Sequence, residues 1–385
     1  KHSYLLKDPE DTARVFKEAF YIAGTGRPGP VLIDITKDVT AAKAEYEYKK
    51  PEPVERVKDT IKTEDVDKVI DMISKAKKPF VFVGGGAVIS GADKELAEFV
   101  KKLQAPVTDS LMGKGAFNGT DPLYMGMLGM HGTKAANFGV SECDLLVVVG
   151  ARFSDRVTGN AKKFATEAKI VQFDIDPAEI NKNVKVDASI IGDIKEILKC
   201  VNAKLTQQKH DEWVAHVEEL AAKYPLTYHK DKLTGPYIME KLYEVTNGDA
   251  IITTEVGQHQ MWAAQHLVVD KPRHHLTSGG CGTMGFGLPG ALGAAFAEPD
   301  KQVVHICGDG GFKMTGMELY TAAREGKKLI SIVINNSCLG MVRQWQQLFY
   351  NEHYSNTLLT EFDFIGFAHS CGAGGRRSGA PQQKH

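Results

Sequence analysis

The residues with the clearest chemical potential stand at the ends of two apolar runs late in the sequence. Residues 302–307 are typical of a buried strand and end in the segment Gly308-Asp309-Gly310-Gly311. The next apolar run, 329–334, ends in Asn335-Asn336. Because the carboxyl ends of neighbouring parallel strands meet at one edge of a sheet, we expect Asp309 and Asn336 to lie close together.

A diphosphate bound through Mg²⁺ suits this pattern. Glycines let backbone amides approach phosphate oxygens, and the start of a helix favours their negative charge. One carboxylate, one side-chain amide and one loop carbonyl, together with phosphate oxygens and water, complete the octahedral shell of Mg²⁺. We therefore predict Asp309, Asn336 and the carbonyl group of Cys338 as metal ligands. The alternatives are a capping carboxylate at Asp309 and a turn residue at Asn336.

A dinucleotide fingerprint is the rival interpretation. Residues 280–285 (GCGTMG) fit the G-x-G-x-x-G pattern between a strand and a helix, and Asp309 is an acidic residue beyond the next strand. However, the spacing from Gly280 to Asp309 exceeds the roughly 20 residues that usually separate the fingerprint from its ribose-binding carboxylate. Such a carboxylate also needs no flanking glycines, whereas Asp309 is enclosed by them. The rival leaves Asn335-Asn336 unexplained, so we favour the diphosphate site.

The elements that must position these residues form an α/β protein with doubly wound parallel sheets. Runs that are apolar on both faces alternate with amphipathic segments, which is typical of parallel sheets covered on both sides. Residues 1–48 contain one helix over 8–23 and one strand over 31–35, and are typical of the end of a larger domain. The remaining predicted units are residues 60–205, a polar helical connector over 206–232, residues 233–370, and an irregular tail over 371–385.

The predicted elements of the two larger units can be given by range. Strands are expected at 79–83, 144–150, 170–176, 250–254, 274–277, 302–307 and 329–334. Helices are expected at 64–76, 93–103, 193–205, 285–297 and 314–326, with Met284 beginning a helix and a turn at Gly84-Gly85-Gly86. The charged, proline-containing segment 40–60 is typical of a linker.

Composition excludes several classes of protein. The 385 residues carry 47 Lys+Arg and 48 Asp+Glu, a net charge of −1, and this balance argues against a nucleic-acid module or a polybasic membrane binder. No window reaches the roughly 18 apolar residues of a membrane span. The 6 cysteines form no C-x-x-C pair, which indicates free thiols in a reducing compartment, so we expect a cytoplasmic protein.

The glycine-aspartate motif and the asparagine pair at the two strand ends resemble a known signature. Gly308-Asp309-Gly310 followed by Asn335-Asn336 is similar to the thiamine-diphosphate motif. More specific segments resemble the acetolactate (acetohydroxyacid) synthase catalytic subunit over about residues 1–370. They are GRPGPVLIDI at 26–35, GARFSDRVTGN at 150–160, DIDPAEINKN at 174–183, VGQHQMWAAQ at 256–265, TSGGCGTMGFGLPGALGA at 277–294 and GMVRQWQ at 340–346.

The resemblance implies a fold and an activity. Residues 1–48 would be the remnant of a pyrimidine-binding domain, 60–205 an FAD-binding domain and 233–370 a diphosphate-binding domain, in a chain truncated at both ends. The implied reaction decarboxylates pyruvate and joins the remainder to a second pyruvate or to 2-ketobutyrate. Its products are 2-acetolactate and 2-aceto-2-hydroxybutyrate, in branched-chain amino-acid biosynthesis. The alternatives are another thiamine-diphosphate carboligase, a pyruvate oxidase, and a non-catalytic α/β binding protein.

The resemblance also implies cofactors and partners. The cofactors are thiamine diphosphate, Mg²⁺ and FAD. The expected assembly is a homodimer or homotetramer with a possible small regulatory subunit, without nucleic acid or membrane. The family's activating glutamate would lie ahead of Lys1, so the 385-residue chain is expected to be inactive by itself.

Site residues follow from the same resemblance. Met284 would bend the cofactor, Arg156 would hold a keto-acid carboxylate, Trp345 would line the second substrate's pocket, and Met130 would join this catalytic group. Gln258 and His259 match the diphosphate loop, beside Gly308, Asp309, Gly310 and Gly311, and Met341 matches a pyrimidine contact. The implied FAD residues are Arg27, Gly84, Gly86, Ser110, Leu111, Leu128, Gly129, Met130, His131, Gly132, Gly150, Ala151, Arg152, Asp174, Ile175, Gly192 and Asp193.

Three residues near the implied site depart from the family pattern. Ser154 stands where Asp is usual, Thr36 where Pro is usual, and Glu255 where Asp is usual. None of them removes a predicted ligand.

Overall fold

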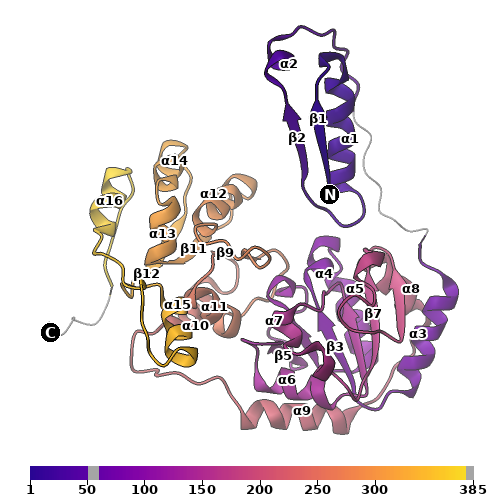
Figure 1. The fold of residues 1–385 in the computed structure, drawn as a ribbon. Helices are drawn as coiled ribbons and strands as arrows, with labels where there is room; N and C mark the ends of the chain where they lie inside the picture. Colours follow the sequence, from indigo (N-terminus) through magenta and orange to yellow (C-terminus); the bar gives the residue numbers. More distant parts are fainter. Residues whose placement is uncertain (51–59, 379–385) are drawn as a thin grey trace.

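The computed structural model describes residues 1–50 and 60–378, and these form three parallel sheets (Figure 1). Part of the predicted linker (51–59) and of the predicted tail (379–385) lies outside the described residues. Among the described residues, no helix combines the length and the hydropathy that crossing a membrane requires. All six cysteines are free thiols, as their spacing predicts.

The first unit is a small two-stranded sheet. Strand β1 (His2–Leu6) pairs with β2 (Val31–Ile35) in parallel, and a short core of Leu6, Val15 and Val39 holds them to α1 (Thr12–Gly24). The 3-10 helix η1 (Pro9–Asp11) precedes α1, and α2 (Lys37–Ala41) follows β2. The prediction of a single strand was wrong, because β1 is only five residues long and its partner lies far along the chain.

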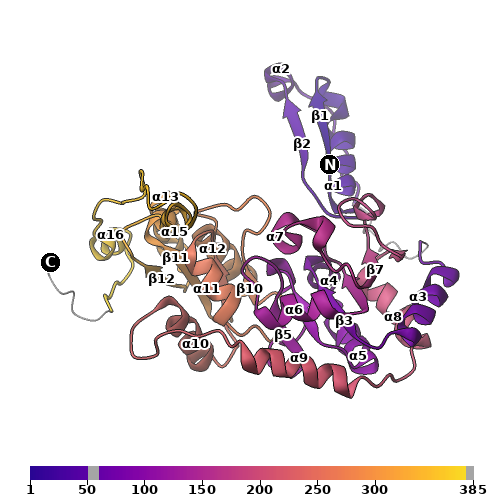
Figure 2. The same ribbon diagram turned by 60° about the horizontal axis from the view of Figure 1, so that its bottom comes forward.

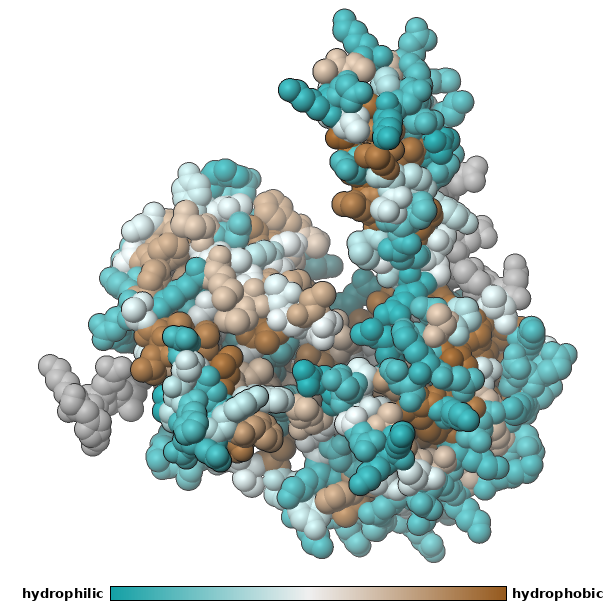
Figure 3. Space-filling view, viewed as in Figure 1, coloured by the Kyte–Doolittle hydropathy of each residue, from teal (hydrophilic) through white to brown (hydrophobic). Residues whose placement is uncertain are grey.

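This first unit projects from the rest of the molecule. Figures 1 and 2 show it standing apart, with only the turn after α1 approaching the central sheet. Apolar side chains are visible on its surface in Figure 3, and Phe20 and Leu32 are 75% and 65% exposed. Much of the apolar surface of its strands and helix therefore faces water in the described chain.

The central unit is a six-stranded parallel sheet in the order β5-β4-β3-β6-β7-β8. Every residue of β3 and β6 is buried, which explains why these runs are apolar throughout. The chain leaves the centre in one direction through β3, β4 and β5, and in the other through β6, β7 and β8. The order reverses between β3 and β6, which is the doubly wound arrangement of dinucleotide-binding domains.

The bounds of the central elements complete this description. The strands are β3 (Pro79–Val83), β4 (Val107–Asp109), β5 (Tyr124–Met127), β6 (Leu145–Val149), β7 (Lys169–Asp174) and β8 (Ala188–Ile191). The helices are α3 (Thr63–Lys75), α4 (Gly85–Ser90), α5 (Asp93–Leu103), α6 (Lys134–Glu142), α7 (Asp155–Thr158) and α8 (Ile194–Lys204), with 3-10 turns η2 (Leu111–Gly113), η3 (Ala161–Lys163) and η4 (Pro177–Glu179). Gly85 and Gly86 therefore begin a helix, where only a turn was predicted.

The connector contains one helix, α9 (Asp211–Lys223), which packs against α6 (Figure 2). Its Trp213 is buried and donates a hydrogen bond from Nε1 to the carbonyl of Pro79 at 2.9 Å. The predicted polar connector is thus a helix fixed to the central sheet.

The last unit is a four-stranded parallel sheet in the order β10-β9-β11-β12. Its strands are β9 (Ile251–Thr254), β10 (His275–Leu276), β11 (Val303–Gly308) and β12 (Ile330–Ile334). Its helices are α10 (Gly235–Thr246), α11 (Gln258–His266), α12 (Gly287–Ala297), α13 (Asp309–Thr315), α14 (Glu318–Arg324), α15 (Gly340–Phe349) and α16 (Phe364–Ser370). The strand order reverses between β9 and β11.

Two helix predictions in this unit need correction. Met284 lies in a turn before α12, because Gly285 has a φ of +77°, a left-handed conformation that a helix cannot include. The predicted helix over 314–326 is two helices, α13 and α14, and α13 already begins at Asp309.

Candidate functional site

The two strand tips named in the sequence analysis meet in the structure. Gly308 of β11 lies opposite Ile334 of β12, so Asp309 and the segment after Ile334 start from neighbouring positions. Burial raises the pKa of the Asp309 carboxyl, and the backbone amides of Gly310 and Ser337 oppose that rise. The Ser337 amide of the second tip donates a hydrogen bond to Asn335 Oδ1 at 3.0 Å.

Cys338 lies at the same place. The pKa of its thiol is raised, first by burial and also by the negative charge of Asp309. The Cys338 amide donates to Asn336 Oδ1 at 3.2 Å, and Leu339 donates to the carbonyl of Thr357 at 2.7 Å. These bonds fold residues 336–339 tightly around the end of β12.

The predicted ligand set fits a magnesium ion held partly by phosphate. Among the described residues, no three His, Cys, Asp or Glu side chains are grouped to bind a metal by themselves. The paired strand tips instead carry one carboxylate (Asp309), one amide (Asn336) and a backbone carbonyl (Cys338). Mg²⁺ accepts such a sparse set of protein oxygens when substrate phosphates and water supply the rest.

Gln258 and His259 lie beside these tips, at the start of α11. Gln258 Oε1 accepts a hydrogen bond from Asn336 Nδ2 at 3.3 Å. His259 is buried next to Gly308, where an added Cβ would lie 3.5 Å from His259 Nδ1. Burial lowers the pKa of His259 to about 4, so its ring is neutral at pH 7. Its Nε2 is buried and has no hydrogen-bond partner among the described residues.

Met284 and Gly310 form the side of the site nearest α12. A Cβ on Gly310 would lie 3.5 Å from Met284 Cε and 2.9 Å from Leu339 Cδ2, so glycine keeps the backbone close to both. Met341 and Trp345 lie on α15, and the ring of Trp345 contacts that of Phe349 at a centroid distance of 5.0 Å. Trp345 is 39% exposed.

A cavity of about 1170 Å³ lies over the carboxyl ends of the central strands and reaches the last unit. Segments that follow β3, β4, β5, β6, β7 and β8 all contribute to its wall. The predicted residues that line it are Arg27, Gly86, Ser110, Leu111, Leu128, His131, Gly150, Ala151, Arg152, Arg156, Asp174, Ile175, Asp193 and Met341. Its size and its place at the reversal of strand order suit a dinucleotide such as FAD.

Five of the predicted FAD residues do not line this cavity. One is Met130, and the other four are glycines that lie behind the wall. They are Gly84, Gly129, Gly132 and Gly192, and none of them lines the cavity. A Cβ on Gly132 would lie 2.8 Å from the backbone of Leu128, and one on Gly129 would lie 2.7 Å from Val157 Cα. These glycines let backbone segments pack directly on one another, which shapes the wall indirectly.

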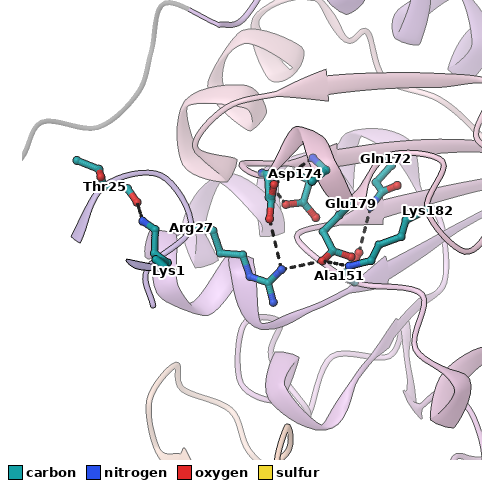
Figure 4. Close-up of polar contacts among 10 residues, drawn as sticks. Lys1, Thr25, Arg27, Ala151, Gln172, Asp174, Glu179 and Lys182 are labelled. Carbon is teal, nitrogen blue, oxygen red and sulfur yellow. Dashed lines mark hydrogen bonds and ion pairs between the residues drawn. The ribbon is translucent and has the colours of Figure 1, made fainter. Parts of the chain in front are cut away.

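Arg27 connects the first unit to the central sheet (Figure 4). Its guanidinium donates to Glu179 at 2.7 Å and lies 3.5 Å from Asp176. The pKa of Glu179 is lowered, because Lys182 and Arg27 together outweigh its burial. Arg27 thus lines the cavity while two carboxylates fix its orientation.

Arg156 lines the cavity, and Met130 lies next to it in the structure. The Met130 amide donates to the carbonyl of Arg156 at 2.9 Å, and the Arg156 side chain is 66% exposed. The pKa of His131 is lowered, first by burial and then by the positive charge of Arg156. Met130 is 50% exposed but does not line the cavity.

Comparisons with known proteins agree with this arrangement. Residues 66–201 match the thiamine pyrophosphate enzyme central domain, and residues 255–384 match the C-terminal domain that binds the same cofactor, also called thiamine diphosphate. The chain is 44% identical to the acetolactate synthase isozyme 2 large subunit of Escherichia coli, over 98% of this chain and 68% of that protein. It is 41% identical to the acetolactate synthase large subunit of Haemophilus influenzae, over 100% of this chain and 69% of that protein.

The chain belongs to the acetolactate synthase large-subunit family. A probable large subunit of Methanocaldococcus jannaschii is 42% identical over 100% of this chain and 68% of its own length. The chain spans 62% of the large subunit of Parasynechococcus marenigrum. As a member of this family it is a thiamine-diphosphate-dependent enzyme with α/β architecture.

Sequence reasoning missed a buried charged cluster in this family member. Lys114 Nζ donates to Tyr124 Oη at 3.0 Å, and Tyr124 donates to Asp109 at 2.7 Å. Lys114 lines the large cavity and also a second one of about 150 Å³ between the central and last units. Nothing in the segment LMGKGA distinguishes this buried lysine from a surface one, because only the packing of the two units encloses it.

Proposed function

We propose that this protein catalyses the acetolactate synthase reaction, with pyruvate as donor and pyruvate or 2-ketobutyrate as acceptor. The observation that carries the proposal is the meeting of Asp309 with the 336–338 segment beside Gln258 and His259. The family supports a thiamine-diphosphate enzyme, and the pairing of β11 with β12 supports a common site for a metal-bound diphosphate at their ends.

In this proposal each group of the cradle has its own task. Asp309, Asn336 and the Cys338 carbonyl hold Mg²⁺, and the glycines at 308, 310 and 311 keep the backbone near the phosphates. His259 is neutral at pH 7 and offers a hydrogen bond without adding charge. Thiamine diphosphate, when bound, supplies the electron sink for loss of CO₂ from a 2-keto acid.

Other residues orient the reactants. Met284 supports the cofactor from the side of Gly310, which favours one bent geometry over free rotation. Arg156 holds a substrate carboxylate through its planar guanidinium, and Trp345 lines the acceptor pocket. Met130 lies beside Arg156 and supports its backbone through a hydrogen bond.

We propose FAD as the ligand of the 1170 Å³ cavity. Asp174 ends β7 and Asp193 precedes α8, and a carboxylate at such a position can bind ribose hydroxyls. The net reaction needs no oxidant, so FAD has a structural role in this proposal. We further propose a homodimer or homotetramer, with a small regulatory subunit as a possible partner.

Product analysis tests the proposed activity. The complete reading frame that contains this chain is incubated with pyruvate, thiamine diphosphate, Mg²⁺ and FAD. The expected product is acetolactate, measured as acetoin after acid treatment, whereas acetyl phosphate or no turnover would contradict the proposal. Residues 1–385 alone form the second arm, and we expect no acetolactate from it because the resemblance places the activating glutamate outside these residues.

A further inference from the structure

Glu255 lies immediately after β9 and is completely buried. Its Oε2 accepts a hydrogen bond from the Gly287 amide at 3.3 Å and lies 4.0 Å from His305 Nε2. Its Oε1 has no hydrogen-bond partner among the described residues. Burying a carboxylate with so few partners is costly, so the position must be favoured by something other than its own hydrogen bonds.

Two glycines make room for this carboxylate. A Cβ built on Gly311 would overlap Glu255 Oε1 and lie 2.5 Å from Cδ. A Cβ built on Gly287 would lie 3.3 Å from Glu255 Oε2 and 2.6 Å from His305 Nε2. Neither glycine has a positive φ, so the absence of a side chain is what these positions require.

Glu255 thereby contacts or belongs to three of the segments that carry predicted residues of the diphosphate end, although not the segment of Asn336 and Cys338. Its own segment continues into Gln258 and His259 on α11. Gly287 begins α12, directly after the turn that contains Met284. Gly311 lies in the first turn of α13, two residues after Asp309. A single side chain packs the three segments against one another from behind the site.

We infer that Glu255 is a positioning residue that sets the spacing of these three segments and so the geometry of the diphosphate-binding loop. This inference rests on the proposed function. Glu255 does not line the large cavity and acts only through Gly287 and Gly311. Its length is the decisive property, because one more methylene than Asp brings Oε1 against Gly311.

The test changes the side-chain size at positions 255 and 311, first singly and then together. Gly311→Ala inserts a methyl group where Oε1 lies and should displace the loop. Glu255→Asp withdraws the carboxylate and should loosen the loop. The double variant Glu255→Asp with Gly311→Ala should restore contact. Gly293→Ala on α12 is the matched control, because a Cβ there meets nothing within 4 Å.

All variants are made in the complete reading frame that contains this chain. The readout is the Kd of that protein for thiamine diphosphate in the presence of Mg²⁺, measured by titration calorimetry, with the thermal midpoint as a check of folding. We expect Gly311→Ala to weaken binding about tenfold or more and Glu255→Asp about fivefold. The double variant should return to within about threefold of the unsubstituted protein, since contacting residues couple. Gly293→Ala should leave the Kd unchanged.

The outcomes separate this inference from the proposed function. If the unsubstituted protein of the complete reading frame does not bind thiamine diphosphate with Mg²⁺, the proposed function fails and the positioning role fails with it. If that protein binds but the double variant is no better than Gly311→Ala, only the positioning role is overturned. If Gly311→Ala does not fold, the Kd of Glu255→Asp decides. An unchanged Kd for Glu255→Asp overturns the positioning role, whether or not the thermal midpoint of that variant shifts.

Discussion

The two larger sheets both carry their candidate ligand residues next to a reversal in strand order, but their strands are buried to different extents. In both, the candidate residues follow strands on either side of a reversal in strand order: β3 and β6 in the central unit, β9 and β11 in the last. Every residue of β3 and β6 is buried, whereas no residue of β12 or α15 is. The central site is therefore built on a closed core, and the diphosphate site borders an open edge.

This difference divides the diphosphate site into two halves. Asp309 and His259 are buried and held by the sheet, while Asn336 is exposed on the side of β12. Apolar residues of α15, including Leu348 and Phe349 at 64% and 65% exposed, lie on that same side. We expect the buried half to be fixed before a ligand binds and the exposed half to depend on the ligand.

The largest expected effect concerns the closed core. Phe82 is completely buried in β3, and Phe82→Ala should lower the free energy of unfolding of the central unit by about 3–5 kcal/mol, because it leaves a cavity that close packing cannot fill. Urea titration followed by circular dichroism measures the change. A loss under about 1 kcal/mol would show that the central sheet is not the rigid region that the comparison requires.

The buried half of the diphosphate site comes next. Asp309→Ala should weaken the binding of thiamine diphosphate at saturating Mg²⁺ by about 100-fold or more, equivalent to about 2.7 kcal/mol, because it removes the only carboxylate of the ligand set. Asp300→Ala, on the exposed turn before β11, is the matched control. Equal affinity of the two variants would remove Asp309 from the site.

The boundary between the two units should show a pH dependence. Loss of hydration, together with the positive charge of Lys114, lowers the pKa of His275 from 6.5 to about 3. Between pH 6.5 and 3 the unfolded chain therefore binds a proton at His275 that the folded chain does not. Stability should fall with decreasing pH in this window, by at most about 1.4 kcal/mol per pH unit, and should not depend on His275 above it.

The variant His275→Gln tests this dependence. Between pH 6.5 and 3, the slope of the unfolding free energy against pH should decrease by the amount that corresponds to one bound proton. His353→Gln, at an exposed position, serves as the control for the loss of an imidazole. An unchanged slope in His275→Gln would mean that the ring is not enclosed beside Lys114.

The smallest expected effect on stability concerns the open edge. Trp345→Ala on α15 should change the free energy of unfolding by less than about 1 kcal/mol, since the side chain is 39% exposed and its helix has no buried residue. Chemical denaturation of the 385-residue chain measures this. A loss near that of Phe82→Ala would show that α15 belongs to a closed core.

Much of the fold could be predicted because parallel strands buried on both faces are continuous apolar runs. PFVFV at 79–83 and LLVVV at 145–149 are such runs, and every residue of both is buried. Strand β1 was missed because HSYLL is short and mixed in polarity, and only pairing with the distant β2 makes it a strand. Met284 was placed in a helix because sequence alone does not show the left-handed φ of Gly285.

The candidate site, like the fold, was predictable only where local sequence patterns mark the residues. Asp309 and Asn336 could be found because both follow recognisable strands. The burial of Lys114 and Glu255 could not, because it results from contacts between segments far apart in the chain, such as Glu255 with Gly311. The wall glycines at 129 and 132 were assigned to the ligand, although they pack against backbone.

The central claim is that Asp309 and Asn336 bind one metal ion together with a diphosphate. Its most direct test is a crystal structure of the protein with Mn²⁺ in place of Mg²⁺ and with thiamine diphosphate, in which anomalous scattering locates the ion. We predict a single peak about 2 Å from both the Asp309 carboxylate and the Asn336 side-chain oxygen. A peak that touches only one of them, or that lies away from both strand tips, would contradict the claim.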